Sequence, residues 1–516
     1  MKSEFKVRVS NIFLLVSLIL FIGFCLRFIN LTVLPVFADE AIYIRWSQIM
    51  HADATLRFLP LSDGKQPLFM WVTIPFLKVF DDPLVAGRFV SVISGMFTIS
   101  GTFLLSFLLF RNFALAIVSA LISAIVPYLV FFDRMALVDS LLTAIGVWTS
   151  VFIVFTVFYK RLDTAMIAGG LLGLAFLTKS PAIFFAILAP FALVFFKFDK
   201  KVKKLHQILK IIGFYLVIYI IAFVIQNIMR LGPNFHMLAI RNKDYVYPLS
   251  HIFDSPFDPL LPFLHRAFEW YLMLGTLGFV FLVFLGICVL ISKGKKKELF
   301  FLLIMGLLPI LVTATFAKVY TARYILFTVP YFCILASAFF ISNTWIKKLS
   351  YGALIVFFAQ SLVLNYYLLT NPAKASLPTG ERSGYLEEWT AGTGIYEISR
   401  YLKEEYKNDP KTKIVVGTEG YFGTLPDGLQ IYLNDVPEIT VIGVGIDLKE
   451  IPKSLKESKE HGNKTYLVIN DSRLKVNPTD VGLEEVISFP KAQRQKGTKE
   501  YENLGVSETL FLYKLN

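Results

Sequence analysis

Long apolar runs fill the first 370 residues of this chain. Most of them reach the roughly 20 residues that a helix needs to cross the hydrocarbon core of a bilayer. The runs lie at about 11–29, 86–110, 113–131, 139–158, 164–178, 181–197, 208–229, 268–291, 299–316, 323–341 and 350–369. Only 17% of the residues are charged, whereas soluble domains average about 25%. The sequence therefore predicts a polytopic α-helical membrane protein with about 11 transmembrane helices.

The positions of lysine and arginine predict how these helices are oriented. With the N-terminus in the cytoplasm, eleven crossings place the basic clusters at 197–210 and 293–297 on the inner side, as the positive-inside rule requires. The net charge of +13 is then expected to face membrane lipids, and no nucleic-acid partner is expected. We predict a multi-pass plasma-membrane protein in which residues 11–29 are a permanent anchor, because no small-residue cleavage site follows them.

The apolar runs end near residue 370, and ordinary soluble composition follows. The predicted domains are 1–370, in the membrane, and 371–516, an extracytoplasmic α/β domain. Strands are expected at 413–418, 429–433, 439–445, 465–470, 485–489 and 509–515, and helices at 395–406 and 448–458. Residues 417–426 are rich in glycine and aromatic residues, which is typical either of a loop that approaches a ligand or of a set of tight turns.

A long outer loop at 30–87 follows the first apolar run and carries two adjacent acids, Asp39 and Glu40. Burying an unpaired ionised acid beside a membrane costs several kcal/mol, so core packing does not explain the pair. Residues 41–50 have helical amphipathic spacing and are expected to lie along the membrane interface. We hypothesise that Asp39 is a catalytic base at the outer surface. The alternative is that both acids cap the interfacial helix.

Five further charged residues are expected at the same outer face: Asp139, Arg134, Lys179, Arg323 and, in the long loop, Lys65. Transfer from a phosphate carrier needs a carboxylate that takes a hydroxyl proton and cations that neutralise the departing phosphate. Structural alternatives stay open for each residue. Asp139 and Arg134 can form an ion pair at a helix start, Lys65 can reach the lipid headgroups, and outer helix ends need polar residues in any case.

Six short motifs occur in a fixed order over the first two-thirds of the chain. They are Ala38-Asp39-Glu40-Ala41, Lys65-Gln66-Pro67-Leu68, Arg88-Phe89, Asp133-Arg134-Met135-Ala136-Leu137-Val138-Asp139, Leu177-Thr178-Lys179-Ser180-Pro181 and Ala322-Arg323-Tyr324-Ile325-Leu326. This ordered set resembles the GT-C glycosyltransferases of the dolichyl-phosphate-mannose protein mannosyltransferase and aminoarabinose transferase type, in their bacterial form. The family often has Lys-Pro-Pro where this chain has Lys65-Gln66-Pro67, which keeps the lysine.

The resemblance implies a GT-C fold and an integral-membrane glycosyltransferase. Its donor would be a sugar linked to a polyprenyl phosphate, and its acceptor a protein, a glycolipid or a cell-wall polymer outside the cytoplasm. The resemblance implies roles for Asp39, Glu40, Asp139, Lys65 and Arg134, and charge and position add Lys179 and Arg323. The site residues expected are, for catalysis, Asp39, Glu40 and Asp139, and, for the donor phosphate or substrate, Lys65, Arg134, Lys179 and Arg323.

No cofactor is expected to be required, because a monophosphate donor does not demand a metal. A divalent ion that bridges Asp39 or Asp139 to the phosphate is compatible with the residue types. The main alternative function is a lipid or glycan transporter or flippase, which would also be a helical bundle. Such proteins usually keep ionisable residues or broken helices near the bilayer midplane, whereas the charges here are expected at one surface.

Overall fold

The computed structural model describes residues 2–342 and 345–516, with side chains from residue 12 onward. Its contacts divide the chain into two compact units. The helical unit comprises Met1–Ile29, Thr55–Trp71 and Phe89–Leu368, and the sheet unit comprises Asn30–Ala54, Val72–Arg88 and Leu369–Asn516. The predicted domain boundary at 370 stays a prediction. The structure adds that two segments of the long loop cluster with the C-terminal residues.

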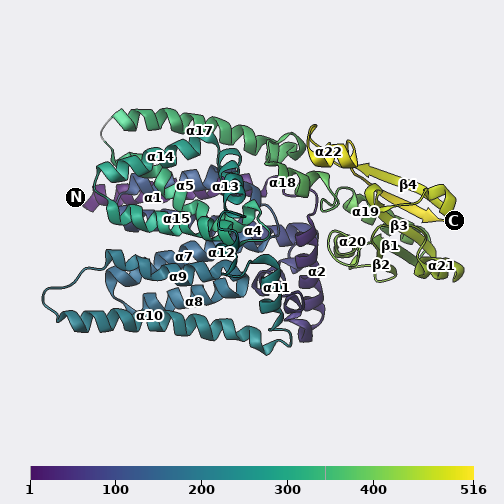
Figure 1. Cartoon of the computed structure of the whole chain (residues 1–516), viewed down its shortest axis with the longest axis horizontal. Helices are drawn as coiled ribbons and strands as arrows, with labels where there is room; N and C mark the ends of the chain where they lie inside the picture. The colour runs from purple at the N-terminus through teal and green to yellow at the C-terminus, as the bar shows by residue number, and fades with distance from the viewer. Residues whose placement is uncertain (1, 343–344) are drawn as a thin grey trace. The chain divides into compact units, whose positions relative to one another are not determined.

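The helical unit holds the apolar runs, and all eleven lie largely in helical structure (Figure 1). Its helices, some of which extend a few residues past the unit boundary, are α1 (Lys2–Phe28), α3 (Leu68–Thr73), α4 (Pro83–Phe110), α5 (Phe113–Ile125), α6 (Pro127–Phe132), α7 (Val138–Tyr159), α8 (Leu162–Thr178), α9 (Ile183–Leu188), α10 (Lys204–Gln226), α11 (Met237–Tyr245), α12 (His251–Asp254), α13 (Leu260–Met273), α14 (Leu277–Ser292), α15 (Lys296–Phe316), α16 (Val329–Ser337) and α17 (Trp345–Thr370). Short 3-10 turns η2 (Leu59–Asp63), η4 (Ser180–Ala182), η5 (Ala189–Phe195), η6 (Asn227–Leu231), η7 (Ala322–Thr328) and η8 (Ala338–Ile341) connect or extend them.

Six helices of the described residues are long and apolar enough to cross a membrane, and a bent pair would make a seventh. Five shorter apolar helices of 10–17 residues accompany them. The run at 268–291, which the sequence predicts as one crossing, is that bent pair, because α13 and α14 meet at an angle of 105°. The turn between them contains Gly275 and Thr276, which has a positive φ of 83°.

Close helix packing in the helical unit depends on small residues. Helix α8 packs against α7 and α10, and its Gly169 and Gly173 are one turn apart on the face toward α10. A Cβ atom on Gly169 would lie 2.8 Å from the carbonyl oxygen of Ile218, and one on Gly173 would lie 2.6 Å from Cβ of Ile225. This is the small-residue spacing that allows backbones to approach in membranes, where lipid removes the usual hydrophobic drive.

The sheet unit is a five-stranded sheet with helices and two segments of the long loop. Its elements are α2 (Ala38–Ala52), η3 (Phe76–Lys78), η9 (Pro372–Lys374), α18 (Thr379–Arg382), η10 (Ser383–Glu387), α19 (Ile395–Asn408), β1 (Ile414–Glu419), α20 (Asp427–Leu433), β2 (Ile439–Gly445), α21 (Lys453–Glu460), β3 (Lys464–Asn470), η11 (Asp471–Arg473), η12 (Pro478–Val481), β4 (Leu483–Pro490), α22 (Lys499–Leu504) and β5 (Thr509–Leu515). The strand order is β2-β1-β3-β5-β4 (Figure 1), with β1 parallel to β2 and β3, and β5 antiparallel to β3 and β4.

Five of the six strands expected in this unit are present, and one prediction is wrong. Residues 429–433 alternate apolar and polar side chains only briefly, and they form part of helix α20 instead of a strand. Leu429, Ile431 and Leu433 are all buried, as is Tyr432. A short apolar run that is buried on more than one face cannot be assigned to a strand or a helix from its periodicity alone.

Candidate active site

Asp39 and Glu40 occupy the first turn of α2, where the unpaired N–H groups and the helix dipole favour acids. Oε2 of Glu40 accepts a hydrogen bond of 3.0 Å from the backbone N–H of Phe37, which closes this turn. Glu40 is completely buried, whereas Asp39 is partly exposed. Of the two adjacent acids, only Asp39 is therefore accessible to a substrate.

Arg88 holds Glu40 and the segment before α2 in place. Its Nε and Nη2 donate to the two carboxylate oxygens of Glu40 at 2.8 and 2.7 Å. The remaining donors bond the carbonyl oxygens of Leu31, Leu34 and Pro35 at 2.7, 3.0 and 3.0 Å. Because a guanidinium has five N–H donors, Arg88 is fully used. The side chains of both Arg88 and Glu40 are completely buried. Glu40 is therefore held in the interior of the sheet unit, next to Asp39 in the chain.

A short β-bridge fixes the chain just before α2 against the segment that follows η10. The N–H of Ala38 donates to the carbonyl oxygen of Thr390 at 3.1 Å, and the N–H of Gly392 donates to that of Val36 at 2.8 Å. A Cβ atom on Gly392 would lie 2.5 Å from Cγ1 and 2.7 Å from the carbonyl oxygen of Val36. Glycine is therefore required for this close approach, which positions the start of α2 and with it Asp39.

The helical unit gathers three of the other predicted residues. Asp139, in the first turn of α7, accepts a hydrogen bond of 2.6 Å from Nζ of Lys179, the residue that ends α8. The ammonium group of Lys179 also lies 4.3 Å from the ring centre of Tyr324 in η7, and Cζ of Arg323 lies 5.7 Å from the same ring. Asp139 is 3% exposed, and its Oδ2 accepts no hydrogen bond from the described residues. One cation, Lys179, thus pairs with a nearly buried carboxylate, and a second, Arg323, contacts the same aromatic ring as Lys179.

The turn that carries Lys65 is tied to the same region. Nε2 of Gln66 donates to Oγ of Ser180 at 2.9 Å, and Ser180 bonds Oδ1 of Asn242 at 3.1 Å. Ser180 is the direct neighbour of Lys179, so the two lysines are linked through this chain of polar contacts. Nζ of Lys65 itself lies 3.6 Å from Oδ2 of Asp63, and both side chains are partly exposed. Asp63 also lies 3.8 Å from Nη2 of Arg241, so its carboxylate is shared between two cations.

Arg134 has a different setting. Its side chain is completely buried, and Nη1 donates to the carbonyl oxygens of Leu26, Arg27 and Ile29 at 3.2, 3.1 and 2.8 Å. These carbonyls belong to the end of α1, where four C=O groups lack helical partners. Arg134 therefore stabilises the end of α1. The acid directly before it in the chain, Asp133, forms a buried ion pair with Arg27, with 2.8 Å between Oδ2 and Nε.

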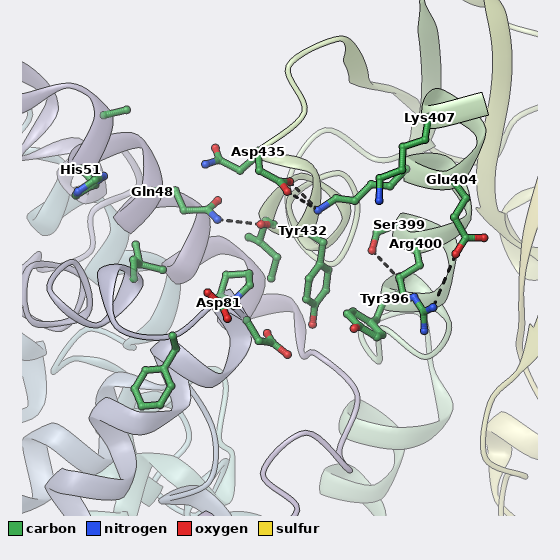
Figure 2. Close-up of a pocket in the computed structure, with 18 residues that line it drawn as sticks. Gln48, His51, Asp81, Tyr396, Ser399, Arg400, Glu404, Lys407, Tyr432 and Asp435 are labelled. Atoms are coloured by element: carbon green, nitrogen blue, oxygen red, sulfur yellow. Dashed lines mark hydrogen bonds and ion pairs between the residues drawn. The ribbon is translucent and has the colours of Figure 1, made fainter. Parts of the chain in front are cut away.

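Figure 2 shows a cavity in the sheet unit, with a volume of about 720 Å³. Helix α19 lines it with Tyr396, Arg400 and Lys407, which recur at helical spacing, and α2 contributes Gln48 and His51. Side chains of both charges line this cavity. Neither of the two acids at the start of α2 is among its lining residues.

A buried ion cluster fixes the segment that leads to the β-bridge. Arg494 donates to the carboxylates of Glu388 and Glu508, at 2.7 Å in each case, and Nζ of Lys491 donates to the backbone oxygen of Glu388 at 3.0 Å. Burial lowers the pKa of Lys491 to about 8, although nearby carboxylates, Glu508 first among them, oppose the shift. Glu388 precedes Trp389 in the chain, so this cluster also holds Trp389 in place.

The described side chains contain no group of three or more His, Cys, Asp or Glu that could hold a metal ion. Single carboxylates such as Asp39 and Asp139 remain hard oxygen ligands for a substrate-bound cation. Sequence reasoning missed Arg88 and Tyr324 as site residues, although both lie inside the quoted motifs. It also missed Asn242. The only sequence feature that pointed to Asn242 was its position in an outer loop.

Comparison with known proteins identifies the fold. Residues 64–225 match the family model of dolichyl-phosphate-mannose-protein mannosyltransferases. The crystal structure of ArnT from Cupriavidus metallidurans in the apo state is similar over 98% of both chains, with a TM-score of 0.59 and 12% sequence identity. The chain has the GT-C fold. The structure of the same ArnT bound to undecaprenyl phosphate gives a TM-score of 0.56 at 14% identity, again over 98% of both chains.

A third solved structure is also similar to this chain. The apo oligosaccharyltransferase of Archaeoglobus fulgidus gives a TM-score of 0.50 at 13% identity, over 89% of this chain and 69% of the other. No curated protein matches the sequence in a sequence search. The resemblance drawn from the ordered motifs is confirmed, and so is the predicted fold class, a helical membrane protein with a C-terminal α/β domain. The family match includes Lys65, Arg134, Asp139 and Lys179 but stops before Arg323 and begins after Asp39.

Proposed function

We propose that this GT-C protein transfers a sugar from a polyprenyl phosphate to a hydroxyl or amine of an extracytoplasmic acceptor. The observation that carries the proposal is the contact of two cations with one ring: Lys179, which pairs with Asp139, and Arg323 both lie against Tyr324. Gln66, the neighbour of Lys65, bonds Ser180 next to Lys179. Cations at the ends of membrane helices suit a lipid phosphate. The similarity to an ArnT structure that contains undecaprenyl phosphate supports the same ligand class.

In the proposed reaction the acceptor oxygen or nitrogen attacks the anomeric carbon from the face opposite the phosphate. The bond between the anomeric carbon and the phosphate oxygen breaks, and the polyprenyl phosphate leaves with one additional negative charge. Lys179, Arg323 and Lys65 stabilise this charge electrostatically. Asp39 takes the proton of the attacking group, and one displacement inverts the anomeric configuration.

Two acids act as positioning residues in this proposal. Glu40, paired with Arg88 inside the sheet unit, holds the first turn of α2 and thereby orients Asp39. Asp139 orients Lys179 through their 2.6 Å contact. Arg134 is not proposed as a phosphate ligand, because its guanidinium is buried against the end of α1. We propose further that the reaction proceeds without a metal. Measuring sugar transfer in the presence of EDTA tests this proposal.

The experiment measures sugar transfer in membranes that contain wild-type protein, Asp39→Asn or Asp81→Asn at matched abundance. Each preparation receives a panel of radiolabelled polyprenyl-phosphate sugars. Asp81→Asn is the control, because Asp81 is an exposed acid of the same long loop. We expect Asp39→Asn to reduce transfer by about 10²–10⁴-fold, the range for loss of a general base, and Asp81→Asn to leave it unchanged.

Each other outcome contradicts a defined part of the proposal. Equal transfer by wild type and Asp39→Asn would remove Asp39 from the chemistry. An absence of transfer from every donor would reject the transferase and favour a lipid or glycan transporter. Retention of the anomeric configuration in the product would reject the single displacement, since attack from the face opposite the phosphate inverts that configuration.

A further inference from the structure

Three exposed aromatic side chains of the sheet unit lie in segments that contact α2. Tyr421 is 72% exposed, Phe422 46% and Trp389 40%. Contiguous exposed apolar surface often marks an interaction site. We propose that Trp389, Tyr421 and Phe422, here called the aromatic platform, bind a saccharide ring of the acceptor. This inference rests on the proposed function and specifies the acceptor class.

The platform lies where an open α/β sheet normally binds ligands. Strands β1, β2 and β3 are parallel, and β1 lies between the other two (Figure 1). The connection after β1 runs to β2 on one side, and the next connection crosses to β3 on the other side. The topological switch point therefore lies at the carboxyl ends of β1 and β3. Ligands of open α/β sheets bind in the crevice outside such a point. Tyr421 and Phe422 follow β1 directly at this end.

The loop that carries the two rings has a defined conformation. Gly420 and Gly423 have positive φ angles of 70° and 120°, which glycine adopts without strain. The N–H of Gly420 donates to the carbonyl oxygen of Gly445 at 2.7 Å, and that of Gly423 donates to Oδ2 of Asp427 at 2.7 Å. Burial of Asp427 raises the pKa of its carboxyl group. These hydrogen bonds fix the backbone of the loop that carries the exposed rings. Binding a ligand there therefore costs little conformational entropy of the loop.

Contacts within the sheet unit connect the platform to the residues around Asp39. The ring centres of Phe422 and Trp46 lie 5.7 Å apart, and Trp46 is on α2, seven residues after Asp39. Seven helical residues span about 10 Å, roughly the length of two sugar rings. On the other side, Trp389 precedes Thr390, whose carbonyl oxygen accepts the N–H of Ala38. An acceptor of two or more sugar rings, with one ring on the platform, would therefore reach the proposed base.

The chemistry of the platform fits a saccharide better than a purely apolar partner. The negative face of an aromatic ring attracts the polarised C–H groups on one face of a pyranose. The guanidinium of Arg473 lies 5.0 Å from the ring centre of Trp389 and brings hydrogen-bond donors for sugar hydroxyls. The hydroxyl of Tyr421 adds a further polar group. A ring face with polar groups at its edge is the combination that a sugar requires, because a sugar is apolar on its faces and polar around its rim.

The test compares wild type, the double variant Tyr421→Ala/Phe422→Ala, the conservative variant Tyr421→Phe/Phe422→Tyr and the control Tyr396→Ala. Tyr396 is another exposed aromatic residue of the same unit, 47% exposed. Membranes with matched protein abundance receive labelled donor over a range of concentrations, and labelled products are separated into protease-sensitive and protease-resistant fractions. Because the substituted rings are exposed, the variants are expected to fold.

We expect label in the protease-resistant, saccharide-containing fraction. The double alanine variant should transfer about tenfold less at saturating donor, the loss that two stacking rings imply. Its KM for the donor should not change, and the conservative variant and Tyr396→Ala should resemble wild type. Transfer at the wild-type rate in the double alanine variant, or label only in protein, would reject the proposal that the platform binds a saccharide. Either result would leave the proposed transferase function standing. No transfer by wild type would overturn the proposed function together with it.

Discussion

Lys179 and Asp139 form the ion pair on which the cation group depends. Asp139 has a side chain that is 3% exposed, and Lys179 one that is 21% exposed. Removing one partner of a buried pair leaves an uncompensated charge and costs about 3–5 kcal/mol of stability. We therefore expect Lys179→Met to lower stability and also to reduce transfer by about 10²–10³-fold, the range for loss of one preorganised donor.

The double variant Lys179→Met/Asp139→Asn separates these two effects. It removes the unpaired charge, so the unfolding temperature in detergent should recover toward wild type while transfer stays low. The measurements are thermal unfolding of the purified protein and transfer in membranes of matched abundance. Recovery of transfer in the double variant would show that Lys179 acts only through stability.

The two adjacent acids show what sequence reasoning can resolve at a single residue. Their position at the start of a helix after the first apolar run was predictable, because acids favour that position. Neighbouring residues in a helix point about 100° apart, so one of the two had to be more buried than the other. Which one is buried depends on Arg88, 48 residues away, and no local pattern gives that contact.

At the scale of elements, the β-bridge before α2 is the contact that positions Asp39 most directly. In Gly392→Ala the new Cβ would meet Val36 at 2.5 and 2.7 Å, so we expect the segment before α2 to move. Transfer should fall at least tenfold, since about 1 Å of displacement can cost 10²-fold in rate. Gly384→Ala is the matched control, because its Cβ would meet no atom within 4 Å. Equal transfer by both variants would contradict this role of the bridge.

Element prediction succeeded where the pattern was long and failed where it was short. The apolar runs of the helical unit each extend over many residues, so their helical structure was predictable. The α20 segment has only seven residues and is buried on several sides, and packing overrode the expected strand. The bend between α13 and α14 was missed because the run at 268–291 is apolar on both sides of Gly275.

At the scale of the whole molecule, the grouping of the long loop could not be read from the sequence. A change of composition along the chain predicted a boundary at residue 370. Composition does not show which distant segments of the chain lie together in space. Asn30–Ala54 and Val72–Arg88 cluster with the C-terminal residues through pairs such as Gln48 with Ile431, which are 383 residues apart. The acids Asp39 and Glu40 therefore belong to the sheet unit, whereas Lys65, Asp139, Lys179 and Arg323 belong to the helical unit.

The proposed reaction requires one membrane face for both groups of residues, and the distribution of lysine and arginine predicts that face. We expect the N-terminus in the cytoplasm and the sheet unit outside. Single cysteines at Lys407, Val319 and Lys200 test this orientation in a background from which Cys25, Cys288 and Cys333 have been removed. Lys407 is exposed in the sheet unit, Val319 is exposed close to Arg323, and Lys200 is exposed in the basic segment at 197–210.

A membrane-impermeant maleimide added to intact cells should label Lys407→Cys and Val319→Cys, whereas Lys200→Cys should react only after the membrane is opened. Lys407 and Asp39 both belong to the sheet unit, and none of the candidate membrane spans of the described residues lies wholly within that unit, so Lys407 reports the side on which Asp39 lies. Labelling of Lys407→Cys and Val319→Cys from opposite sides would separate the proposed base from the phosphate-binding cations, and no single transfer reaction could then use both. Labelling of Lys407→Cys and Val319→Cys only after the membrane is opened, with Lys200→Cys labelled on intact cells, would keep the chemistry but reverse its side, and the acceptor would then be cytoplasmic.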